Sequence, residues 1–402
     1  MELGPIFRAL RRHRARFLLI SIEVAFTLAI VVNSLSLIGR AKAQMNHPSG
    51  FDDANLIWVA SSTFAPEFAD EAYARDVIDS DREVLVHLPG VRAAANTFFL
   101  PWQGGGSSFE LKIEGSDREQ VRSQAYRGDP DLLATLDVEV VAGRGFTWEE
   151  YESRTGEETS LNVLISQALA DLLFPQGGAL GKLLTDTDER ATYTVVGILD
   201  QFYNPYGWPI HEYVCFFPGP SGGTGGSGFL VRTEPGQVPA VMREIERALL
   251  AETGGRTLEV TSILEVKDRF NLGNRVTVSS LNAIMVLLVL VTVLGIVGIT
   301  SFSVAERTRQ IGTRRALGAT REDILRYFLL ENWLSTTVGI TLGVGLAVAL
   351  NVGLVSILAD ARLDGAILAG AVLTLWLLGL ASALGPALRA TQVPPAVATR
   401  NV

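Results

Sequence analysis

The chain has 402 residues, a formal net charge of −9 at neutral pH and a positive mean hydropathy, which is uncommon for a soluble protein. The acidic balance argues against nucleic acid as a partner, because that polyanion is bound by basic surfaces. A single cysteine, Cys215, excludes an intrachain disulfide, and we expect it in the core of a strand.

Residues 17–38 form the first of four long apolar stretches. A basic start and Ala41-Lys42-Ala43, which is shaped like a cleavage site, would also suit a secretory signal peptide. The apolar run of about 22 residues is longer than the roughly 7 to 15 residues of a cleavable signal. We therefore predict an uncleaved membrane anchor, preceded by a cytoplasmic amphipathic stretch at residues 1–16.

Two polar residues, Glu23 and Asn33, lie inside this first stretch. An acidic side chain there costs about 2.5 to 3.5 kcal/mol on insertion scales, so it must face a partner, water or the bundle interior. One interpretation is a coupling or gating contact. The other, which the neighbouring Thr27 and Ser34 favour, is a polar interface between helices.

Residues 39–275 contain most of the acidic side chains and a succession of short predicted strands and helices. The elements at the two ends of this segment look like one subdomain, with a second inserted at about residues 128–218. We predict a large extracytoplasmic α+β domain in two subdomains. Its aromatic-rich loops at 98–102 and 202–208 suit a contact surface and a domain core equally well.

Catalytic and metal-binding patterns are weak in this sequence. The four histidines lack the spacing of a metal site. The segment GGALGKL at 177–183 has neither the opening glycine nor the hydroxyl group for Mg²⁺ that a phosphate-binding loop needs. We therefore expect no catalytic, metal or cofactor site in this chain.

Three further apolar stretches follow, and each can cross the roughly 30 Å hydrocarbon core as a helix. The sequence thus predicts an α-helical membrane protein with four transmembrane helices. Their order is TM1 at 17–38, the outer domain at 39–275, TM2 at 276–304, a connector at 305–331, TM3 at 332–358, a short outer loop at 359–365, TM4 at 366–388 and a tail at 389–402.

The connector at 305–331 carries six arginines, and further arginines precede the first apolar stretch. Short arginine-rich segments stay on the cytoplasmic side of a membrane. Both termini and the connector are therefore expected in the cytoplasm, and residues 39–275 outside it.

The order of residues in the connector is more specific than its charge. The segment VAERTRQIGTRRALGAT at 304–320 resembles the signature of the FtsX/MacB-type ABC transporter permeases, with Gln310 where that family usually has Glu. The segments LPGV at 88–91, GRGFT at 143–147 and TVVGIL at 194–199 are similar to the periplasmic core domain of MacB-type permeases. The resemblance covers nearly the whole chain.

The resemblance implies a transport permease of the bacterial inner membrane rather than an enzyme. Because only about sixteen residues precede the first span, the ATPase is expected to be a separate chain. In the family the connector docks on that ATPase. The coupling residues implied here are Glu306, Arg307, Arg309, Ile311, Gly312, Arg314, Arg315, Ala316, Leu317, Gly318, Ala319 and Arg321.

The resemblance also implies a dimer with a second permease, identical or different, that transmits ATP-driven motion to the outer domain. The arginines of the connector would contact the ATPase or anionic membrane lipid. The expected result is efflux of an apolar or peptide-like substrate, with a periplasmic adaptor and an outer-membrane channel as further partners. Two alternatives are a signal relay that activates a periplasmic enzyme, as in FtsX-like members, and lipoprotein extraction. The large two-part outer domain favours efflux.

Overall fold

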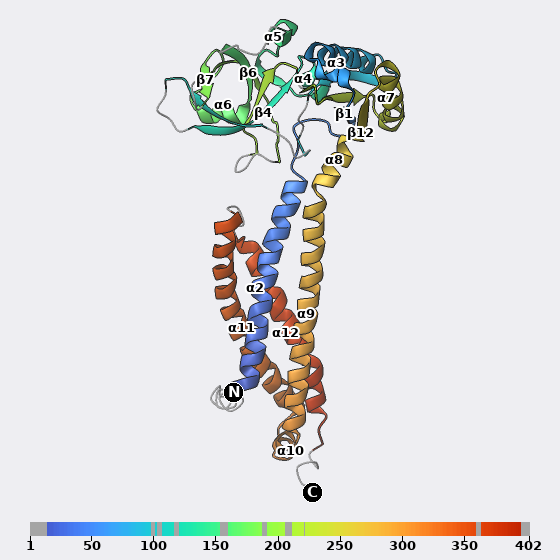
Figure 1. Ribbon diagram of the computed structural model, residues 1–402. Helices are drawn as coiled ribbons and strands as arrows, with labels where there is room; N and C mark the ends of the chain where they lie inside the picture. Colours follow the sequence, from blue (N-terminus) through green and yellow to red (C-terminus); the bar gives the residue numbers. More distant parts are fainter. Residues whose placement is uncertain are drawn as a thin grey trace. The chain divides into compact units, whose positions relative to one another are not determined.

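The computed structural model describes residues 14–97, 101–102, 107–115, 120–152, 160–186, 191–205, 211–220, 222–358 and 363–394 (Figure 1). The chain divides into two compact units. One is formed by Asn46–Leu272, and the other by the segments before and after it.

The helical unit confirms the prediction of four long apolar helices. Four of its helices are long and apolar enough to cross a membrane, and a short fifth helix lies in the connector. They are α2 (Arg14–Met45), α9 (Leu272–Glu306), α10 (Thr308–Ala316), α11 (Arg321–Leu358) and α12 (Gly365–Thr391). The long helices extend beyond the predicted apolar stretches, because polar residues at their ends continue the same backbone hydrogen bonding.

Helix α2 packs most extensively on α11, and small residues permit the close approach. A Cβ atom added at Gly343 would lie 3.0 Å from the backbone of Ala25. The apolar centre of the unit combines side chains from four helices, among them Leu28, Ile296, Ala347 and Leu375. The helix pair is therefore held by backbone proximity as well as by side-chain packing.

The first sheet of the other unit is antiparallel, with strand order β10-β11-β1-β12 and β2 paired to β11. Successive residues of β1 face opposite sides, as a pleated strand requires. Ile57 and Val59 pack with helices α3 (Glu71–Val86) and α7 (Val238–Glu252), whereas Leu56 and Trp58 belong to a separate core on the other face. The strands are β1 (Leu56–Thr63), β2 (Val91–Asn96), β10 (Gly222–Gly223), β11 (Gly226–Thr233) and β12 (Arg256–Ser262).

The second sheet has seven strands in the order β5-β8-β6-β9-β4-β3-β7, and an additional pairing of β7 with β8 closes it on itself. Its interior is apolar and includes Leu111, Val163 and Leu184, all fully buried. The strands are β3 (Ser107–Ile113), β4 (Val121–Gly128), β5 (Val140–Gly143), β6 (Ser160–Ser166), β7 (Leu183–Asp186), β8 (Thr192–Leu199) and β9 (Val214–Pro218). Shorter helical elements are η1 (Pro66–Ala69), α4 (Leu132–Leu136), α5 (Trp148–Glu152), α6 (Gln167–Leu173) and α8 (Ile263–Phe270).

The second sheet begins earlier in the chain than the inserted segment expected at about 128–218. Strands β3 and β4 precede residue 128, yet they pair with β7 and β9 of the second sheet. The strand pattern alone did not reveal this, because the partner of a strand is decided by long-range pairing. The part of the chain that forms the second sheet therefore starts at β3.

Cys215 and the described parts of the two aromatic loops lie in the core. Cys215 is fully buried in β9, as expected. Trp102, Phe202 and Tyr203 are at most 5% exposed, so the described parts of both aromatic loops are core rather than surface. Residues 98–100 and 206–208 of these loops lie outside the described part of the chain.

Candidate functional site

The connector forms a helix and a tight turn between α9 and α11. Helix α10 follows directly on α9, and Thr308 Oγ1 donates to the carbonyls of Val304 and Ala305 at 3.0 and 2.9 Å. After α10 the backbone turns at Gly318, whose φ of +101° suits glycine and few other residues. The sequence thus places a helix end at the second glycine of the motif.

Helix α11 begins with a reciprocal cap that sets the direction of the chain after the turn. Thr320 Oγ1 accepts the amide of Asp323 at 3.2 Å, and Asp323 Oδ2 accepts the amide of Thr320 at 3.0 Å. This is a capping box, in which two unpaired amides at a helix start are satisfied by side chains. We define the connector turn as residues 316–321, between the body of α10 and the start of α11.

An apolar cluster attaches α10 to its neighbours. Ile311 packs with Ile324 and Phe328 of α11 and with Ala387 and Ala390 of α12. Ile311 is only 4% exposed. Ile311, one of the expected coupling residues, therefore fills the protein's own core in this structure.

A buried ion pair holds the start of the connector against α11. Arg307 is 6% exposed, and its two terminal nitrogens bind the two carboxylate oxygens of Glu331 at 2.7 and 3.0 Å. Tyr327 contributes its hydroxyl at 3.4 Å from Arg307. Arg307, which was expected to contact the ATPase, is thus occupied within the chain, and its partner Glu331 was not among the expected site residues.

Two other arginines connect the ends of neighbouring helices. Arg315 at the end of α10 donates to the carbonyls of Thr391 and Val393, which lie at the end of α12. Arg16 in the first turns of α2 pairs with Glu306 at the end of α9. Residue types alone could not assign these partners, since the paired residues are far apart in the sequence.

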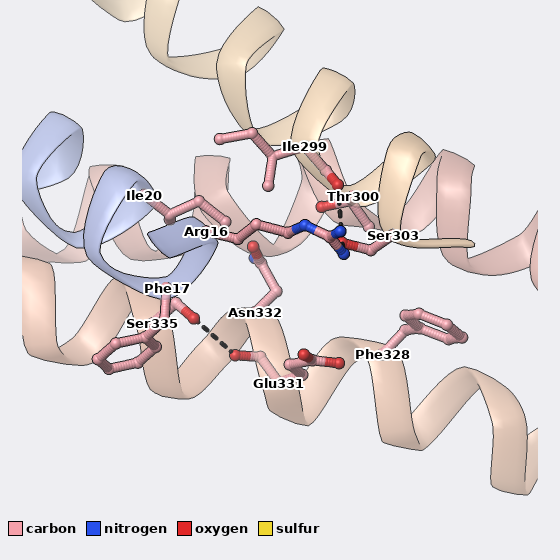
Figure 2. Close-up of a pocket in the computed structure, with 10 residues that line it drawn as sticks. All are labelled: Arg16, Phe17, Ile20, Ile299, Thr300, Ser303, Phe328, Glu331, Asn332 and Ser335. Carbon is pink, nitrogen blue, oxygen red and sulfur yellow. Dashed lines mark hydrogen bonds between the residues drawn. The ribbon is translucent and has the colours of Figure 1, made fainter. Parts of the chain in front are cut away.

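A small cavity of about 30 Å³, lined by both polar and apolar side chains, lies where α2, α9 and α11 meet (Figure 2). Arg16 Nη1 reaches Ser303 Oγ at 3.4 Å, and Ser335 Oγ donates to the carbonyl of Glu331 at 3.0 Å. Asn332 Nδ2 donates to the carbonyl of Gly379 at 2.9 Å, while its buried Oδ1 has no partner among the described residues. The volume is sufficient for about one water molecule, which would satisfy that oxygen.

The exposed part of the connector is concentrated in and around the connector turn. Among the large apolar side chains that the structure describes, Leu317 is the most exposed, at 83%. Most of the other expected coupling residues are exposed too, whereas Arg315 and Ala319 are half-buried and Gly312 is buried. The exposed residues are Glu306, Arg309, Arg314, Ala316, Gly318 and Arg321.

The two expected intramembrane polar residues lie at helix interfaces. Asn33 donates to the carbonyl of Ala347 at 3.2 Å and accepts from Asn351 at 3.3 Å, both on α11. The Glu23 carboxylate lies against α9 at Gly295, where an added Cβ atom would collide with it. One helical turn further, Thr27 and Thr292 share a hydrogen bond of 2.8 Å.

Cofactor and metal chemistry find little support in the described part of the chain. No group of three or more histidine, cysteine or acidic side chains among those residues could hold a metal ion. The glycine-rich segment at 177–183 leads directly into strand β7, whereas a phosphate-binding loop leads into a helix. The connector instead has an exposed leucine, several exposed arginines, and contacts that join it to α11 and α12.

Two family models match the chain. The FtsX-like permease C-terminal model matches residues 282–395, and the MacB-like periplasmic core domain model matches residues 18–248. The first match includes the connector and the last three long helices, and the second includes α2 and most of the sheet-containing unit.

Similar proteins are found among bacterial transporters. The chain is 25% identical to the macrolide export ATP-binding/permease protein MacB of Azoarcus sp. (strain BH72), over 85% of this chain and 51% of that protein. It is 25% identical to the uncharacterized ABC transporter permease YknZ of Bacillus subtilis (strain 168), over 65% and 66% of the two chains. The chain thus spans about half the length of this MacB relative and less than two thirds of YknZ.

The periplasmic region of MacB from Actinobacillus actinomycetemcomitans is a solved structure that resembles part of the chain. It aligns with a TM-score of 0.37 and 11% identity, covering 56% of this chain and 96% of that structure.

Proposed function

Because the chain belongs to the family of FtsX-like permeases with a MacB-like periplasmic core domain, we propose that its connector turn is the docking site for an ABC ATPase. The supporting observation is the 83% exposure of Leu317 between the exposed Arg314 and Arg321. An apolar side chain surrounded by cations suits a pocket with an acidic rim on a protein partner. The exposed remainder of the coupling set would form the edge of this contact.

The internal contacts of the connector support its role as a transmitter of force. Ile311 attaches α10 to α11 and α12, and the Arg307–Glu331 pair attaches the end of α9 to α11. A displacement of the connector turn is therefore passed to three transmembrane helices together. Helix α9 leads back to the extracytoplasmic domain, so that movement driven by ATP hydrolysis would reach that domain through the chain itself.

We place ATP and Mg²⁺ on a partner chain. The MacB relative is described as an ATP-binding/permease protein, whereas YknZ is described as a permease. The present chain matches both over its permease and periplasmic parts, so it is consistent with a permease that works with a separate ATPase. The mass of the native polypeptide in membranes tests this directly.

The proposed orientation places both termini and the connector in the cytoplasm of a bacterium, with the protein in the inner membrane. The arginine-rich connector and the arginines before the first span support this placement. Residues 46–272 lie on the other side, as the periplasmic core domain of the family requires.

A second permease is proposed as a partner within the membrane. Helix α9 has little buried surface, and Leu287, Leu290 and Leu294 on it are more than half exposed. Whether the second permease is identical or different is decided by which chain covers this face.

For cargo we propose an apolar or peptide-like molecule exported by movement of the outer domain, with an adaptor and an outer-membrane channel.

The docking site is tested by the substitution Leu317→Asp in the full chain. Purification in mild detergent from native membranes should recover the ATPase with the wild type and lose most of it with the variant. Leu172→Asp, at a 41% exposed leucine on α6, is the control and should retain the ATPase. Equal recovery with both variants would reject the connector turn as the docking site.

The other proteins recovered with the wild type distinguish the proposed activity from its alternatives. An adaptor and an outer-membrane channel would support efflux. A cell-wall enzyme without a channel would indicate a signal relay, and a lipoprotein carrier would indicate lipoprotein extraction.

A further inference from the structure

A groove of about 450 Å³ lies between α9 and α12 in the helical unit. Its volume is within the range of about 300 to 1,000 Å³ that is typical of small-molecule sites. The walls are mainly aliphatic, and the only charged residue in them is Arg389. The residues that matter for the argument are Val293 and Val297 on α9 and Leu378, Ala381, Gly385 and Arg389 on α12.

The sequence of α12 explains why this face is hollow. Residues 378, 381, 385 and 389 recur every three or four positions and so lie on one face of the helix. Ala381 and Gly385 are small, and a Cβ atom added at Gly385 would meet no atom within 4 Å. The groove is therefore lined by small side chains on α12, between two helices whose backbones approach each other closely at few positions.

Arg389 gives the groove a charged end. It stands in the last turn of α12 and is exposed. Its guanidinium has no hydrogen bond or ion pair to any other residue that the structure describes. An unpaired arginine at a membrane–water boundary favours a phosphate group, to which it donates hydrogen bonds in a planar, bidentate arrangement.

The end of the groove at Arg389 lies toward the C-terminal end of α9. Helix α9 leaves that domain at its first residue, and Val293 and Val297 lie in the half of α9 that is nearer its far end at Glu306. Arg389 shares the groove with these two valines. The cation therefore belongs to the leaflet opposite the extracytoplasmic domain, which is where anionic lipids attract basic side chains.

We propose that this groove binds an anionic phospholipid, with an acyl chain between α9 and α12 and the phosphate on the Arg389 guanidinium. An aliphatic channel beside one unpaired cation complements a lipid whose head group has a net negative charge, whereas the choline of phosphatidylcholine cancels the charge of its phosphate. This inference rests on the proposed orientation of the helices in the membrane, and it does not depend on ATPase docking at the connector turn.

A helix of a second permease is the main competing occupant, and the arrangement of α9 argues against it. At 3.6 residues per turn, Leu287 and Leu294 lie about 60° to 120° around α9 from Val293 and Val297, and Leu290 lies between the two pairs. The more exposed leucine face is thus available to a partner helix without filling the groove. A helix partner would also leave Arg389 beside apolar side chains.

The test uses the full chain in liposomes of phosphatidylcholine that contain a trace of photoactivatable lipid with a diazirine in the middle of one acyl chain. The probe is phosphatidylglycerol in one series and phosphatidylcholine in the other, and labelled residues are located by mass spectrometry. We expect phosphatidylglycerol to label the groove residues of α9 and α12 preferentially. Arg389→Gln should reduce that labelling about fivefold, the factor that one interfacial arginine contributes, and leave phosphatidylcholine labelling unchanged.

Two further variants make the result specific. Gly385→Leu fills the groove and should abolish labelling there by both lipids. Arg326→Gln removes an exposed arginine near the start of α11 and should change nothing in the groove. Monodisperse elution and unchanged thermal unfolding verify that each variant is folded.

Three outcomes would overturn the proposal. Equal labelling of the groove by both lipids would mean that it holds ordinary bulk lipid. Unchanged phosphatidylglycerol labelling in Arg389→Gln would remove the role of the cation. A disulfide between two copies of a Val297→Cys variant would assign the groove to a second permease. The native Cys215 should not form this disulfide, because burial raises the pKa of its thiol to about 12 and keeps it unreactive.

Discussion

Arg307 and Glu331 are separated by one helix and one turn in the sequence, yet they form a bidentate ion pair that is almost closed to solvent. The pair joins the residue between α9 and α10 to the body of α11. It thereby determines where α10 leaves the bundle. The cations that remain exposed on the connector are those that this pair and the Arg315 contacts do not use.

Replacing Glu331 by Gln should destabilise the helical unit by about 3 to 5 kcal/mol, because it leaves the Arg307 charge buried without its counter-ion. The measurement is thermal unfolding of the full chain in detergent. Arg326→Gln is the control, since Arg326 is 65% exposed and its pair with Glu322 at 3.8 Å contributes little. The exchange Arg307→Glu with Glu331→Arg should recover part of the loss. A melting temperature equal to that of the control would contradict this assignment.

Replacing Gly343 by Leu should separate α2 from α11. The new side chain would meet the backbone of Ala25 and the Cβ atom of Leu28 at 3.0 Å, and such overpacking costs about 1 to 3 kcal/mol. Gly345→Leu, two residues along the same helix, meets no atom within 4 Å at its Cβ and should be tolerated. Proteolysis of the reconstituted protein compares the two. Equal resistance would show that α2 is not packed here as closely as the structure indicates.

Replacing Gly318 by Ala should strain the connector turn by about 1 to 3 kcal/mol, because its φ of +101° is unfavourable for a residue with a Cβ atom. The expected readout is faster amide hydrogen exchange in α10, together with weaker recovery of the ATPase. Gly298→Ala on α9 has open space around its Cβ and should leave exchange in α10 unchanged. Unaltered exchange in the Gly318 variant would show that the turn tolerates another conformation.

The extracytoplasmic domain should become less stable as the pH rises from about 4 to 7, because of Asp129. Burial raises the pKa of its carboxyl to about 7, although the carboxylate accepts the amide of Asn96 at 2.7 Å and lies 3.5 Å from Arg82. An unfolded Asp has a pKa of about 3.9, so in this range the folded state holds a proton that the unfolded state has released. The contribution of this group is therefore complete below pH 4 and falls by up to about 1.4 kcal/mol per pH unit as the pH rises to 7.

The substitution Asp129→Asn isolates this effect, because an amide does not titrate. Its unfolding free energy, followed in urea from pH 4 to pH 7, should change less steeply than that of the wild type. Asp137→Asn, at an exposed position with φ of +59° that Asn accepts readily, should keep the wild-type slope. Parallel slopes for wild type and Asp129→Asn would mean that the carboxyl is ionised throughout this range.

The sequence by itself determined the parts of this protein that depend on local composition. Four long, mainly apolar stretches correspond to four long helices, because a chain in a hydrocarbon layer must satisfy the hydrogen bonds of its backbone within each segment. The glycine at 318 and the Thr320–Asp323 spacing similarly marked the end of one helix and the start of the next. These features follow from residues that are close together in the chain.

Only the tertiary structure decided which residues of the connector are available. Nothing in the sequence separated Ile311 and Arg307 from Leu317 and Arg314 as coupling residues. The fold buries the first two side chains and exposes the other two. Their partners in α11 and α12 are brought near by helix packing, as β3 and β4 are brought into the second sheet by pairing with β7 and β9. The groove beside Arg389 likewise arises only when residues of α9 and α12, which are far apart in the sequence, come to line one space. Burial and ion pairing are properties of long-range contacts, and a local pattern carries no information about which distant side chain will supply them.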